Sequence, residues 1–431
     1  MNLEKLIEQR QARIAVIGLG YVGLPLLLAF GQAGFEVFGF EVNERKVALL
    51  KRGFDPSLQK NNLLLKKLLN SNRLKLYSRP DILRKADVII ICVPTPLSHR
   101  RKPDLTYIRE AVQYIKGNFK KGQLIILEST SYPGTTEEEI LAPLASRNCR
   151  VGRDFFLAFS PERIDPGNKK FNLREIPKVV GGVTARCTRL GCGLYGCVFN
   201  RVYPASSAGT AEMEKLLENI FRSVNIALVN ELAMLCRKMG LDIWEVIQLA
   251  ATKPYGFMPF YPGPGLGGHC IPVDPFYLAW KAREYNFATK FIELAGEINT
   301  QMPDYVVSLV SEALSSVGKY FKNSSILVLG VTYKKDIPDT RESPALKILE
   351  LLAEKGSRVA FHDPFVGELI LDGRKYHRVS LKKLASFDCV LLVTDHSTYN
   401  PEWIYHRCQL LVDTRGVTRN LKDVHKKIIR L

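Results

Sequence analysis

One thiol stands in an unusual setting in the segment YPGPGLGGHCIPVDP, residues 261–275, where Cys270 follows four glycines and is flanked by prolines. Glycine has no side chain, so the backbone there can approach a ligand closely. A thiolate in such a segment can attack a carbonyl carbon and form a covalent intermediate. The same spacing is equally consistent with a buried structural thiol in a turn. Spacing alone leaves both interpretations open.

A second glycine cluster has the spacing of a dinucleotide-binding turn. The segment GLGYVG, residues 18–23, follows an apolar strand pattern and precedes an apolar helical pattern, and the next strand pattern ends at Glu41. In a Rossmann unit the glycines let a pyrophosphate lie against the backbone at the helix N-terminus, and the acid accepts hydrogen bonds from a ribose. We therefore predict a dinucleotide site whose residues are Gly18, Gly20, Tyr21, Val22, Gly23 and Glu41. Because a carboxylate repels a 2′-phosphate, Glu41 favours NAD over NADP, despite the nearby Arg45 and Lys46.

The chain repeats a pattern of apolar strands and amphipathic helices that would position these residues. The strand patterns lie at residues 13–20, 35–43 and 86–96, and again at 325–333, 357–364 and 387–395. Such alternation predicts parallel sheets covered by helices on both faces. The predicted fold class is therefore α/β, with two Rossmann-like doubly wound parallel-sheet domains joined by a long central helix and helical region. Residues 16–34 are apolar enough to suggest a membrane span, but their Gly and Pro spacing favours a buried strand, turn and helix.

The central region contains a long helical pattern at residues 210–240. It has no proline, and its only glycine is the terminal Gly240, a typical helix stop. A helix of about 30 residues spans about 45 Å, so it can join two domains and offer an apolar face for dimerisation. The predicted domains are an NAD-binding domain at 1–208, a central helical domain with the cysteine segment at 209–318, and a UDP-sugar-binding domain at 319–431.

The composition and charge of the chain favour a soluble protein with anionic ligands and argue against nucleic-acid binding. The 46% hydrophobic and 24% charged content is typical of a soluble globular protein, and the net charge of +18 favours anionic ligands. The Lys and Arg residues are scattered without a nucleic-acid-binding motif, so we expect no nucleic-acid partner. Nine cysteines without an evident secretory signal indicate reduced thiols and a cytoplasmic protein. The spacing of Cys187, Cys192 and Cys197 suits no metal site, so no metal is expected.

The chain resembles the UDP-glucose/GDP-mannose dehydrogenase family over essentially its whole length. The motifs that carry the resemblance are VIGLGYVGLP, CVPTP, ESTSYPGTT, FSPERIDPGN, AEMEKLLEN, GPGLGGHCIPVDP, YKKDIPDTRESPA and DTRG. The resemblance implies an NAD-dependent enzyme that oxidises the C6 alcohol of a sugar nucleotide to a carboxylate, through a thiohemiacetal and a thioester on a cysteine. The segments FSPERIDPGNKKF and GGHCIPVDPFYL are most similar to the branch that acts on UDP-N-acetylglucosamine, since the UDP-glucose enzymes usually have Lys where Val273 stands.

Several alternatives stay open. The substrate could be UDP-glucose or UDP-N-acetylgalactosamine, and the chain could also be a non-catalytic nucleotide-sugar-binding protein with the same fold. A hydroxyacid dehydrogenase with one Rossmann domain would explain neither the second α/β unit nor the cysteine segment.

The resemblance also implies roles in catalysis. Cys270 would be the nucleophile of the second oxidation, and Lys215 and Asn219, one helical turn apart, would contact the developing oxyanion. Asp274 would order water together with Lys215 and assist proton transfer. Glu162 would be the general base for thioester hydrolysis. Each role has a structural alternative. Lys215 could be an ordinary solvated helix charge, and Glu162 could form a loop ion pair with Arg163.

Further residues match ligand contacts of the family. The predicted cofactor contacts beyond the glycine turn are Lys46, Thr95, Thr130 and Arg341. Thr130 would also hold the water that accepts the first proton. Lys334 and Arg415 match groups that hold the diphosphate and the uridine end of UDP. The predicted substrate-binding residues are Glu162, Arg163, Lys215, Asn219, Tyr261, Gly267, Lys334 and Arg415.

Overall fold

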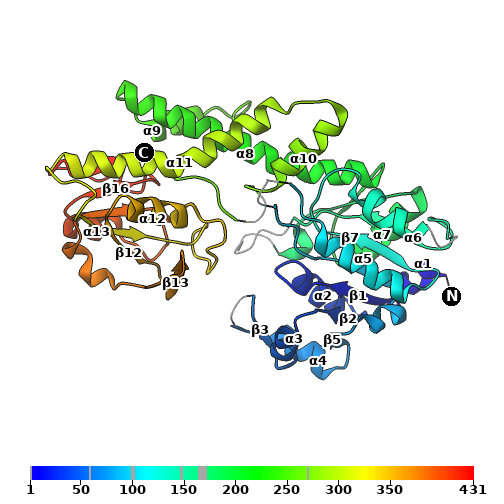
Figure 1. The fold of residues 1–431 in the computed structure, drawn as a ribbon. Coiled ribbons are helices and arrows are strands. Elements are labelled where there is room, and N and C mark those ends of the chain that lie inside the picture. Colours follow the sequence, from blue (N-terminus) through cyan, green and yellow to red (C-terminus); the bar gives the residue numbers. More distant parts are fainter. Residues whose placement is uncertain (1, 58–59, 99–101, 146–148, 164–171, 269–270) are drawn as a thin grey trace. The chain divides into compact units, whose positions relative to one another are not determined.

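The computed structural model describes residues 2–57, 60–98, 102–145, 149–163, 172–268 and 271–431. The chain forms two compact units. The first unit is Met1–Glu218 with Phe276–Asn286, and the second is Asn219–Pro275 with Phe287–Leu431. Each unit contains one large sheet and the helices that cover it (Figure 1).

The first unit is built on an eight-stranded sheet with the strand order β10-β9-β8-β7-β6-β1-β2-β5. The strands are β1 Arg13–Ile17, β2 Glu36–Phe40, β5 Leu74–Tyr77, β6 Val88–Ile91, β7 Leu124–Leu127, β8 Phe156–Phe159, β9 Lys178–Gly182 and β10 Val202–Ala205. Neighbouring strands are parallel except for the antiparallel pair β8 and β9. Every residue of β6, β7 and β8 is buried, as expected for central strands with both faces covered.

Helices cover the two faces of this sheet because alternate strand residues point in opposite directions. One face packs its residues Val16, Ile90 and Ile126 into a core that includes Phe30 of α2. On the other face, Phe40 makes an edge-to-face contact with a tyrosine of α5. The helices and short strands of this unit are α1 Leu3–Glu8, α2 Gly23–Gln32, α3 Glu44–Lys51, β3 Phe54–Asp55, β4 Lys60–Asn61, α4 Leu63–Asn70, α5 Thr106–Asn118, α6 Ala142–Ala145, α7 Ala185–Gly196 and α10 Asp274–Ala282.

The apolar segment 16–34 forms the end of β1, the glycine turn and α2, so the predicted strand, turn and helix are confirmed. Among the described residues, no helix combines the length and apolar character that crossing a membrane requires.

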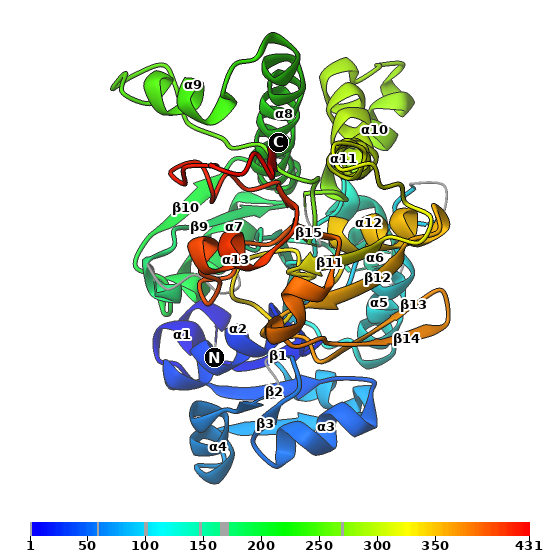
Figure 2. The same cartoon turned by 90° about the vertical axis from the view of Figure 1, so that its left-hand side faces the viewer.

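The second unit contains a five-stranded parallel sheet with the order β12-β11-β15-β16-β17. Figure 2 labels three of its strands, β11, β12 and β15. Its strands are β11 Ser325–Leu329, β12 Arg358–His362, β15 Cys389–Leu392, β16 Leu411–Asp413 and β17 Ile428–Arg430, and a hairpin is formed by β13 Glu368–Leu371 and β14 Arg374–His377. Val328 and Leu391 pack with α11 and α12 on one face, and Leu327 and Val390 pack with α13 on the other. The helices are α9 Ile243–Ala250, α11 Lys290–Ser315, α12 Pro344–Glu354 and α13 Pro401–Arg407. The structure therefore confirms a second Rossmann-like sheet.

The long central helix is also confirmed. It is α8, Ala208–Met239, with 32 residues, and its first part belongs to the first unit and the remainder to the second. Gly240 follows with φ +72°, a left-handed conformation that ends a helix at little cost for glycine.

Candidate active site

The glycine turn after β1 has a steric reason for glycine at two of its three glycine positions. Gly18 has φ +87°, and a Cβ there would lie 2.5 Å from the carbonyl oxygen of Cys92. A Cβ on Gly23, at the start of α2, would lie 2.0 Å from the carbonyl oxygen of Gly18. A Cβ on Gly20 would meet no heavy atom of the described residues within 4 Å. The turn thus needs two glycines for its own packing and leaves open space at the third, where a pyrophosphate fits against the helix N-terminus.

Glu41 follows β2 directly and faces this turn. One carboxylate oxygen accepts the N–H of Leu19 at 3.3 Å and forms an ion pair with the Lys46 ammonium at 2.7 Å. The other accepts the N–H of Asn43 at 3.3 Å. The side chain of Asn43 caps α3 by accepting the N–H of Lys46 at 3.1 Å. The open space at Gly20 and the adjacent acid fit a dinucleotide whose ribose bonds to Glu41, and Lys46 is held beside that carboxylate.

The other predicted cofactor residues of this unit follow the neighbouring strands. Val22 precedes α2, and Tyr21 precedes it in the same turn. Thr95 lies beyond β6, where its carbonyl oxygen accepts the hydroxyl of Tyr277 at 2.6 Å. Thr130 lies beyond β7 and is half-buried. The carboxyl ends of adjacent parallel strands meet at one sheet edge, which is where ligands bind in such folds.

A buried charge cluster lies at the same edge and escaped the sequence analysis. Glu128 follows β7 and forms an ion pair at 3.0 Å with Lys178 of β9, and both side chains are almost fully buried. The hydroxyl of Tyr195 donates a hydrogen bond to Glu128. Burial raises the pKa of Glu128 to about 7, against the opposing effect of Lys178. The Lys178 ammonium also donates to the carbonyl oxygen of Pro161 at 2.9 Å, so the cluster anchors the segment that carries Glu162.

The segment 161–163 is bound to α8 by two side chains. The Lys215 ammonium donates to the carbonyl oxygen of Glu162 at 2.5 Å. The Arg163 guanidinium bonds to Glu214 at 2.9 Å and to Glu218. Burial and the negative charge of Glu218 raise the pKa of Glu214 to about 7. The structure therefore brings Glu162 and Lys215 together, and Arg163 forms ion pairs with two carboxylates of the same helix.

A second anchor fixes the first turn of α8. Glu212 is buried, and its carboxylate accepts the N–H of Gly134 at 2.6 Å and the N–H of Thr136 at 2.9 Å. It also accepts the hydroxyl of Thr136 at 2.6 Å. These bonds join the helix that carries Lys215 to the segment that follows Thr130. The only sequence signal was the motif AEMEK itself, because nothing in the pattern distinguished Glu212 from a solvated helix acid.

In the second unit, Asn219 and Asp274 meet. The Asn219 side-chain amide donates to the Asp274 carboxylate at 2.5 Å, and both residues are buried. Asp274 is the first residue of α10, and Asn219 lies one turn after Lys215 in α8. Two residues to which the resemblance gives separate catalytic roles are thus hydrogen-bonded to each other.

The glycine segment that precedes the predicted nucleophile packs closely against protein groups. The N–H of Gly263 donates to the side-chain oxygen of Asn230 at 2.9 Å, and a Cβ on Gly263 would lie 2.8 Å from the Arg415 guanidinium. A Cβ on Gly267 would lie 2.6 Å from Cβ of Tyr333. The close approach that these glycines allow in the structure is therefore to other parts of the second unit. Cys270 and His269 lie outside the described residues.

The remaining predicted residues of this unit lie in three places. Tyr261 stacks on Trp244, with ring centroids 5.8 Å apart. Lys334 lies in the segment after β11, and Arg341 bonds through its guanidinium to Asp339 at 2.8 and 2.5 Å. Arg415 lies after β16, where its guanidinium donates to the carbonyl oxygen of Val393 at 2.7 Å. Lys334 and Arg415 thus both follow strands of the parallel sheet.

Comparison with known proteins covers nearly the whole chain. The family descriptions that match are UDP-glucose/GDP-mannose dehydrogenase family NAD binding domain at residues 12–198, central domain at 209–301 and UDP binding domain at 327–420. A UDP-N-acetyl-D-glucosamine 6-dehydrogenase of Pseudomonas aeruginosa is 37% identical over 90% of this chain and 92% of its own length. A UDP-N-acetyl-D-mannosamine dehydrogenase of Pyrococcus horikoshii is 37% identical over 94% and 96%. A solved structure of a UDP-D-ManNAc dehydrogenase from that organism aligns with a TM-score of 0.87 and 34% identity, covering 97% of this chain and 98% of that one.

Proposed function

This chain belongs to the UDP-glucose/GDP-mannose dehydrogenase family, and from this premise we propose that it oxidises the C6 alcohol of UDP-N-acetylglucosamine to the uronic acid in two steps. Its NAD-binding domain and its relatives make it an NAD-dependent UDP-sugar 6-dehydrogenase. The observation that carries the proposed chemistry is the buried bond between Asn219 and Asp274, one helical turn from Lys215. A buried amide one helical turn from Lys215, with a buried carboxylate as its partner, can bind and stabilise a charge that develops on a substrate oxygen.

NAD supplies the hydride acceptor for both oxidations. In the first, the alcohol loses a hydride from C6 and a proton to a water held by Thr130, and an aldehyde forms. The Cys270 thiolate then adds to the aldehyde carbon, and loss of a second hydride converts the thiohemiacetal to a thioester. Water cleaves the thioester, releasing the carboxylate and the thiol. One sugar therefore consumes one water and yields two NADH.

The remaining roles that we propose are those that the resemblance to the family implies. Lys215 and Asn219 donate hydrogen bonds to the oxyanion that develops on the sugar oxygen in both oxidations. Asp274, held by Asn219, orders the attacking water and takes part in proton transfer. Glu162 is the base for hydrolysis, on a segment held by Lys215 through its backbone oxygen. Arg163, the next residue, forms ion pairs with Glu214 and Glu218 of α8.

In the second unit, Lys334 and Arg415 bind the diphosphate and the uridine end of the substrate. Both follow strands of the parallel sheet, where phosphate ligands bind in such folds. Val273 is the residue that favours an acetamido sugar over glucose. UDP-N-acetylmannosamine is the second candidate substrate, because a relative of 37% identity and the aligned structure bear that name.

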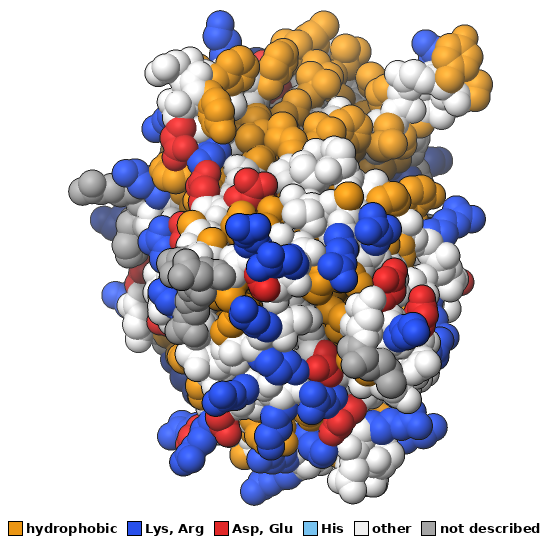
Figure 3. All heavy atoms as spheres, turned by 90° about the vertical axis from the view of Figure 1, so that its right-hand side faces the viewer, with side chains coloured by type: hydrophobic (Ala, Val, Ile, Leu, Met, Phe, Trp, Pro, Cys, Tyr) orange, Lys and Arg blue, Asp and Glu red, His pale blue; other side chains and the backbone are white. Residues whose placement is uncertain are grey.

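We also propose that two copies associate through the central helix. Hydrophobic side chains gather at the upper, helical end of the face in Figure 3. The exposed apolar residues of α8 are Met213, Leu217, Phe221, Leu228, Leu232, Leu235 and Met239. An exposed apolar stripe of this length is typical of a protein interface. Light scattering at micromolar concentration is expected to give a dimer, and a monomer would contradict this proposal.

The experiment that tests the function is a comparison of NADH yield on UDP-N-acetylglucosamine, UDP-N-acetylmannosamine, UDP-N-acetylgalactosamine and UDP-glucose. Two NADH per sugar are expected, with the highest kcat/KM on the first. A yield of one NADH with free aldehyde would contradict the thioester pathway. Binding of UDP-sugars, seen as a rise in Tm, without any NADH absorbance would indicate a non-catalytic binding protein.

The nucleophile is tested by Cys270→Ala, with Cys192→Ala as the matched control. Net turnover is expected to be lost in the first variant, because the second hydride leaves only from the thiohemiacetal. Cys192 is half-buried in α7, and its loss is expected to leave turnover near the wild-type rate. Full activity of Cys270→Ala would reject the covalent route.

A further inference from the structure

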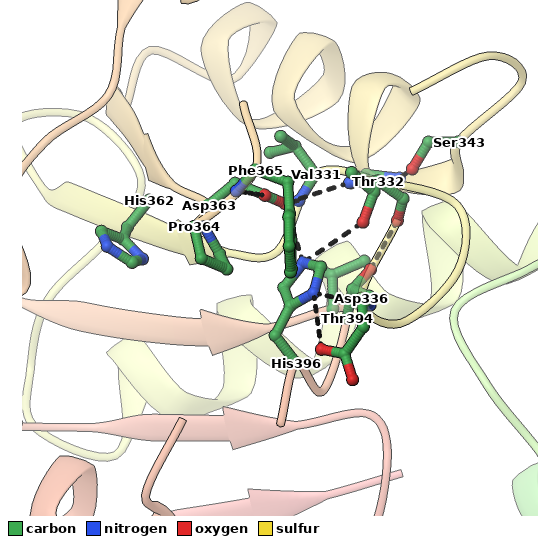
Figure 4. Close-up of polar contacts among 12 residues, drawn as sticks. Val331, Thr332, Asp336, Ser343, His362, Asp363, Pro364, Phe365, Thr394 and His396 are labelled. Atoms are coloured by element: carbon green, nitrogen blue, oxygen red, sulfur yellow. Dashed lines mark hydrogen bonds and ion pairs between the residues drawn. The ribbon is translucent and has the colours of Figure 1, made fainter. Parts of the chain in front are cut away.

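A buried histidine joins three segments at the carboxyl edge of the second sheet (Figure 4). His396 follows β15, and its side chain is 0% exposed, as is that of Asp363, which follows β12. Nε2 of His396 lies 2.9 Å from a carboxylate oxygen of Asp363. Nδ1 accepts the backbone N–H of Asp336 at 3.0 Å. Neither side chain has a role in the chemistry proposed above.

The partners of the ring determine which nitrogen accepts and which donates. A backbone N–H can only donate, so Nδ1 is the acceptor of the Asp336 N–H. Nε2 lies beside the Asp363 carboxylate and 3.2 Å from the Thr332 hydroxyl. The same carboxylate also accepts the N–H of Val331 at 2.8 Å and the N–H of Thr332 at 3.3 Å, so Asp363 orients the ring.

The turn 332–336 is tied to the segment after β15 at both ends. At its start, the hydroxyl of Thr394 donates to the carbonyl oxygen of Thr332 at 2.7 Å. At its end, Asp336 has φ +61°, and its carboxylate accepts the N–H and the hydroxyl of Ser397 at 2.9 and 2.6 Å. A left-handed aspartate costs backbone energy and persists only where its neighbours hold it. The bond from the Asp336 N–H to His396 is one of those that hold it.

This turn carries residues that matter to the site. Lys334 is in its middle, and its backbone oxygen accepts the hydroxyl of Thr332 at 3.0 Å. Tyr333 lies against the glycine segment, where a Cβ on Gly268 would lie 2.8 Å from its ring. Whatever holds the turn therefore sets the position of Lys334 and the surface on which the glycine segment packs.

We propose that His396 is a positioning residue for substrate binding: by accepting the Asp336 N–H it holds the turn 332–336 so that Lys334 meets the diphosphate of the UDP-sugar. Asp363 orients the ring and supplies the acceptor for its proton. A lysine on a turn that is already ordered binds an anion without the entropy cost of ordering the turn, which would otherwise weaken binding. The inference rests on the proposed function for the identity of the ligand.

Two substitutions separate the two ring nitrogens. The amide oxygen of His396→Asn takes the place of Nδ1 and keeps the acceptor for the Asp336 N–H. The amide nitrogen of His396→Gln takes the place of Nε2 and keeps only the donor to Asp363. We expect His396→Gln to raise the Kd for UDP and the KM for the UDP-sugar about tenfold with kcat changed less than about threefold, and His396→Asn to stay near wild type.

The neighbouring histidine provides the matched control. His362 ends β12, and its ring bonds to the hydroxyl of Tyr399 at 3.0 Å rather than to the turn. His362→Gln is therefore expected to leave the Kd for UDP unchanged. If it weakens UDP binding as much as His396→Gln does, general loss of structure at this edge explains the effect and the proposal is rejected.

A double-mutant cycle tests whether His396 acts through Lys334. In the Lys334→Met background, His396→Gln is expected to have little further effect on the Kd for UDP. Additive losses would overturn the proposal, as would equal losses for His396→Asn and His396→Gln. If His396→Gln does not fold, Ser397→Ala, which removes only the hydroxyl donor to Asp336, is expected to weaken UDP binding about threefold, and an unchanged Kd would reject the proposal.

The two hypotheses fail differently. If the wild-type protein oxidises none of the UDP-sugars but UDP binding still depends on His396 as described, the proposed function is wrong and the positioning role stands. If the wild-type protein oxidises UDP-sugars and the Kd for UDP is the same in both His396 variants as in the wild type, the positioning role alone is wrong.

Discussion

The two large sheets share one local structure after their first strand. After β1, Gly18 has φ +87° and its N–H donates to the carbonyl oxygen of Phe40 at 2.9 Å. After β11, Gly330 has φ +80° and its N–H donates to the carbonyl oxygen of His362 at 2.9 Å. In both cases a Cβ would strike a backbone oxygen, at 2.5 Å for Gly18 and at 2.4 Å for Gly330. The chain thus builds the same strand and turn twice.

The acid that follows the second strand is where the two units differ. Glu41 accepts the N–H of Leu19 at 3.3 Å, and Asp363 accepts the N–H of Val331 at 2.8 Å, so the two carboxylates occupy equivalent places. The Glu41 side chain keeps 11% exposure, whereas that of Asp363 is 0% exposed and bonded to His396. In the first unit, Glu41 is accessible enough to accept a hydrogen bond from a ribose. In the second unit, Asp363 is buried under His396 and bonds to the backbone of the turn that begins at Val331.

This difference shows how one scaffold serves two ligands. A strand, a glycine turn and an acid bind a dinucleotide when the acid is accessible and the turn opens a helix with space at Gly20. When the acid is buried, the same elements support the turn 332–336 through His396, and we propose that Lys334 in that turn binds the ligand.

Alanine at the two equivalent glycines is expected to have the largest effect. The left-handed backbone and the contact with a backbone oxygen make each of Gly18→Ala and Gly330→Ala destabilising by about 3 kcal/mol. Gly18→Ala should abolish NADH binding while UDP binding persists, and Gly330→Ala should do the reverse. Fluorescence titration with NADH and calorimetry with UDP measure the two.

The control for this pair is Gly193→Ala. This glycine lies in α7, and a Cβ there would meet no heavy atom of the described residues within 4 Å. Stability should be unchanged or slightly higher, because alanine favours a helix over glycine. If Gly18→Ala and Gly330→Ala both impaired the same ligand, the functional division of the two turns would be wrong.

Exchanging each acid for its amide is expected to have a smaller effect, and each exchange should weaken the binding of a different ligand. Glu41→Gln should weaken NAD binding about tenfold, since a charged acceptor for the ribose hydroxyls becomes neutral, with UDP binding unchanged. Asp363→Asn should leave NAD binding unchanged and weaken UDP binding. The test is to measure the dissociation constants of both variants for NAD and for UDP. Weaker NAD binding by Asp363→Asn would contradict the assignment of this buried carboxylate to the UDP-binding turn alone.

The pH dependence of stability should have opposite signs for two buried acids. Burial on its own would raise the pKa of Asp363, but the hydrogen bonds from His396 and Val331 outweigh it, so the pKa lies below its usual value. Its stabilisation is present above the usual pKa of 3.8 and is lost as the pH falls through the lowered value. Burial raises the pKa of Glu128 to about 7, so its ionisation costs stability that returns as the pH falls from about 7 towards 4.5.

Urea unfolding at a series of pH values measures this contrast. Relative to Glu128→Gln, the wild type should gain about 1 kcal/mol per pH unit as the pH falls within that window. Relative to Asp363→Asn, the wild type should lose its advantage only under more acidic conditions. A wild type that lost stability relative to Glu128→Gln between pH 7 and 5 would contradict the raised pKa.

Much of the fold was predictable because burial leaves a periodic trace in the sequence. The strand patterns that end at Glu41 and Asp363 correspond to β2 and β12, and the uninterrupted pattern before Gly240 corresponds to α8. The glycine turn was recognisable because its spacing reports steric needs within a few residues. The domain boundaries and the roles of the site residues stay predictions.

The polar anchors were not predictable in the same way. His396 and Asp363 are 33 residues apart, and Glu212 and Thr136 are 76 apart. Each looks like an ordinary loop or surface residue in the sequence. The glycines before Cys270 also received their explanation only from the structure, where they pack against Tyr333 and Arg415.

The sequence by itself determined the strands, the helices, the dinucleotide turn and the family, because these depend on local periodicity, local sterics and motifs. Only the tertiary structure decided which buried charges meet, such as Glu128 with Lys178 and Asp363 with His396. The physical reason is that a polar group is buried at an acceptable free energy only where a partner satisfies it. Lys178 reaches Glu128 because β9 runs antiparallel to β8, so that the first residue of β9 lies at the carboxyl end of the neighbouring strands. His396 reaches Asp363 because both follow strands of one parallel sheet, whose carboxyl ends gather at one edge.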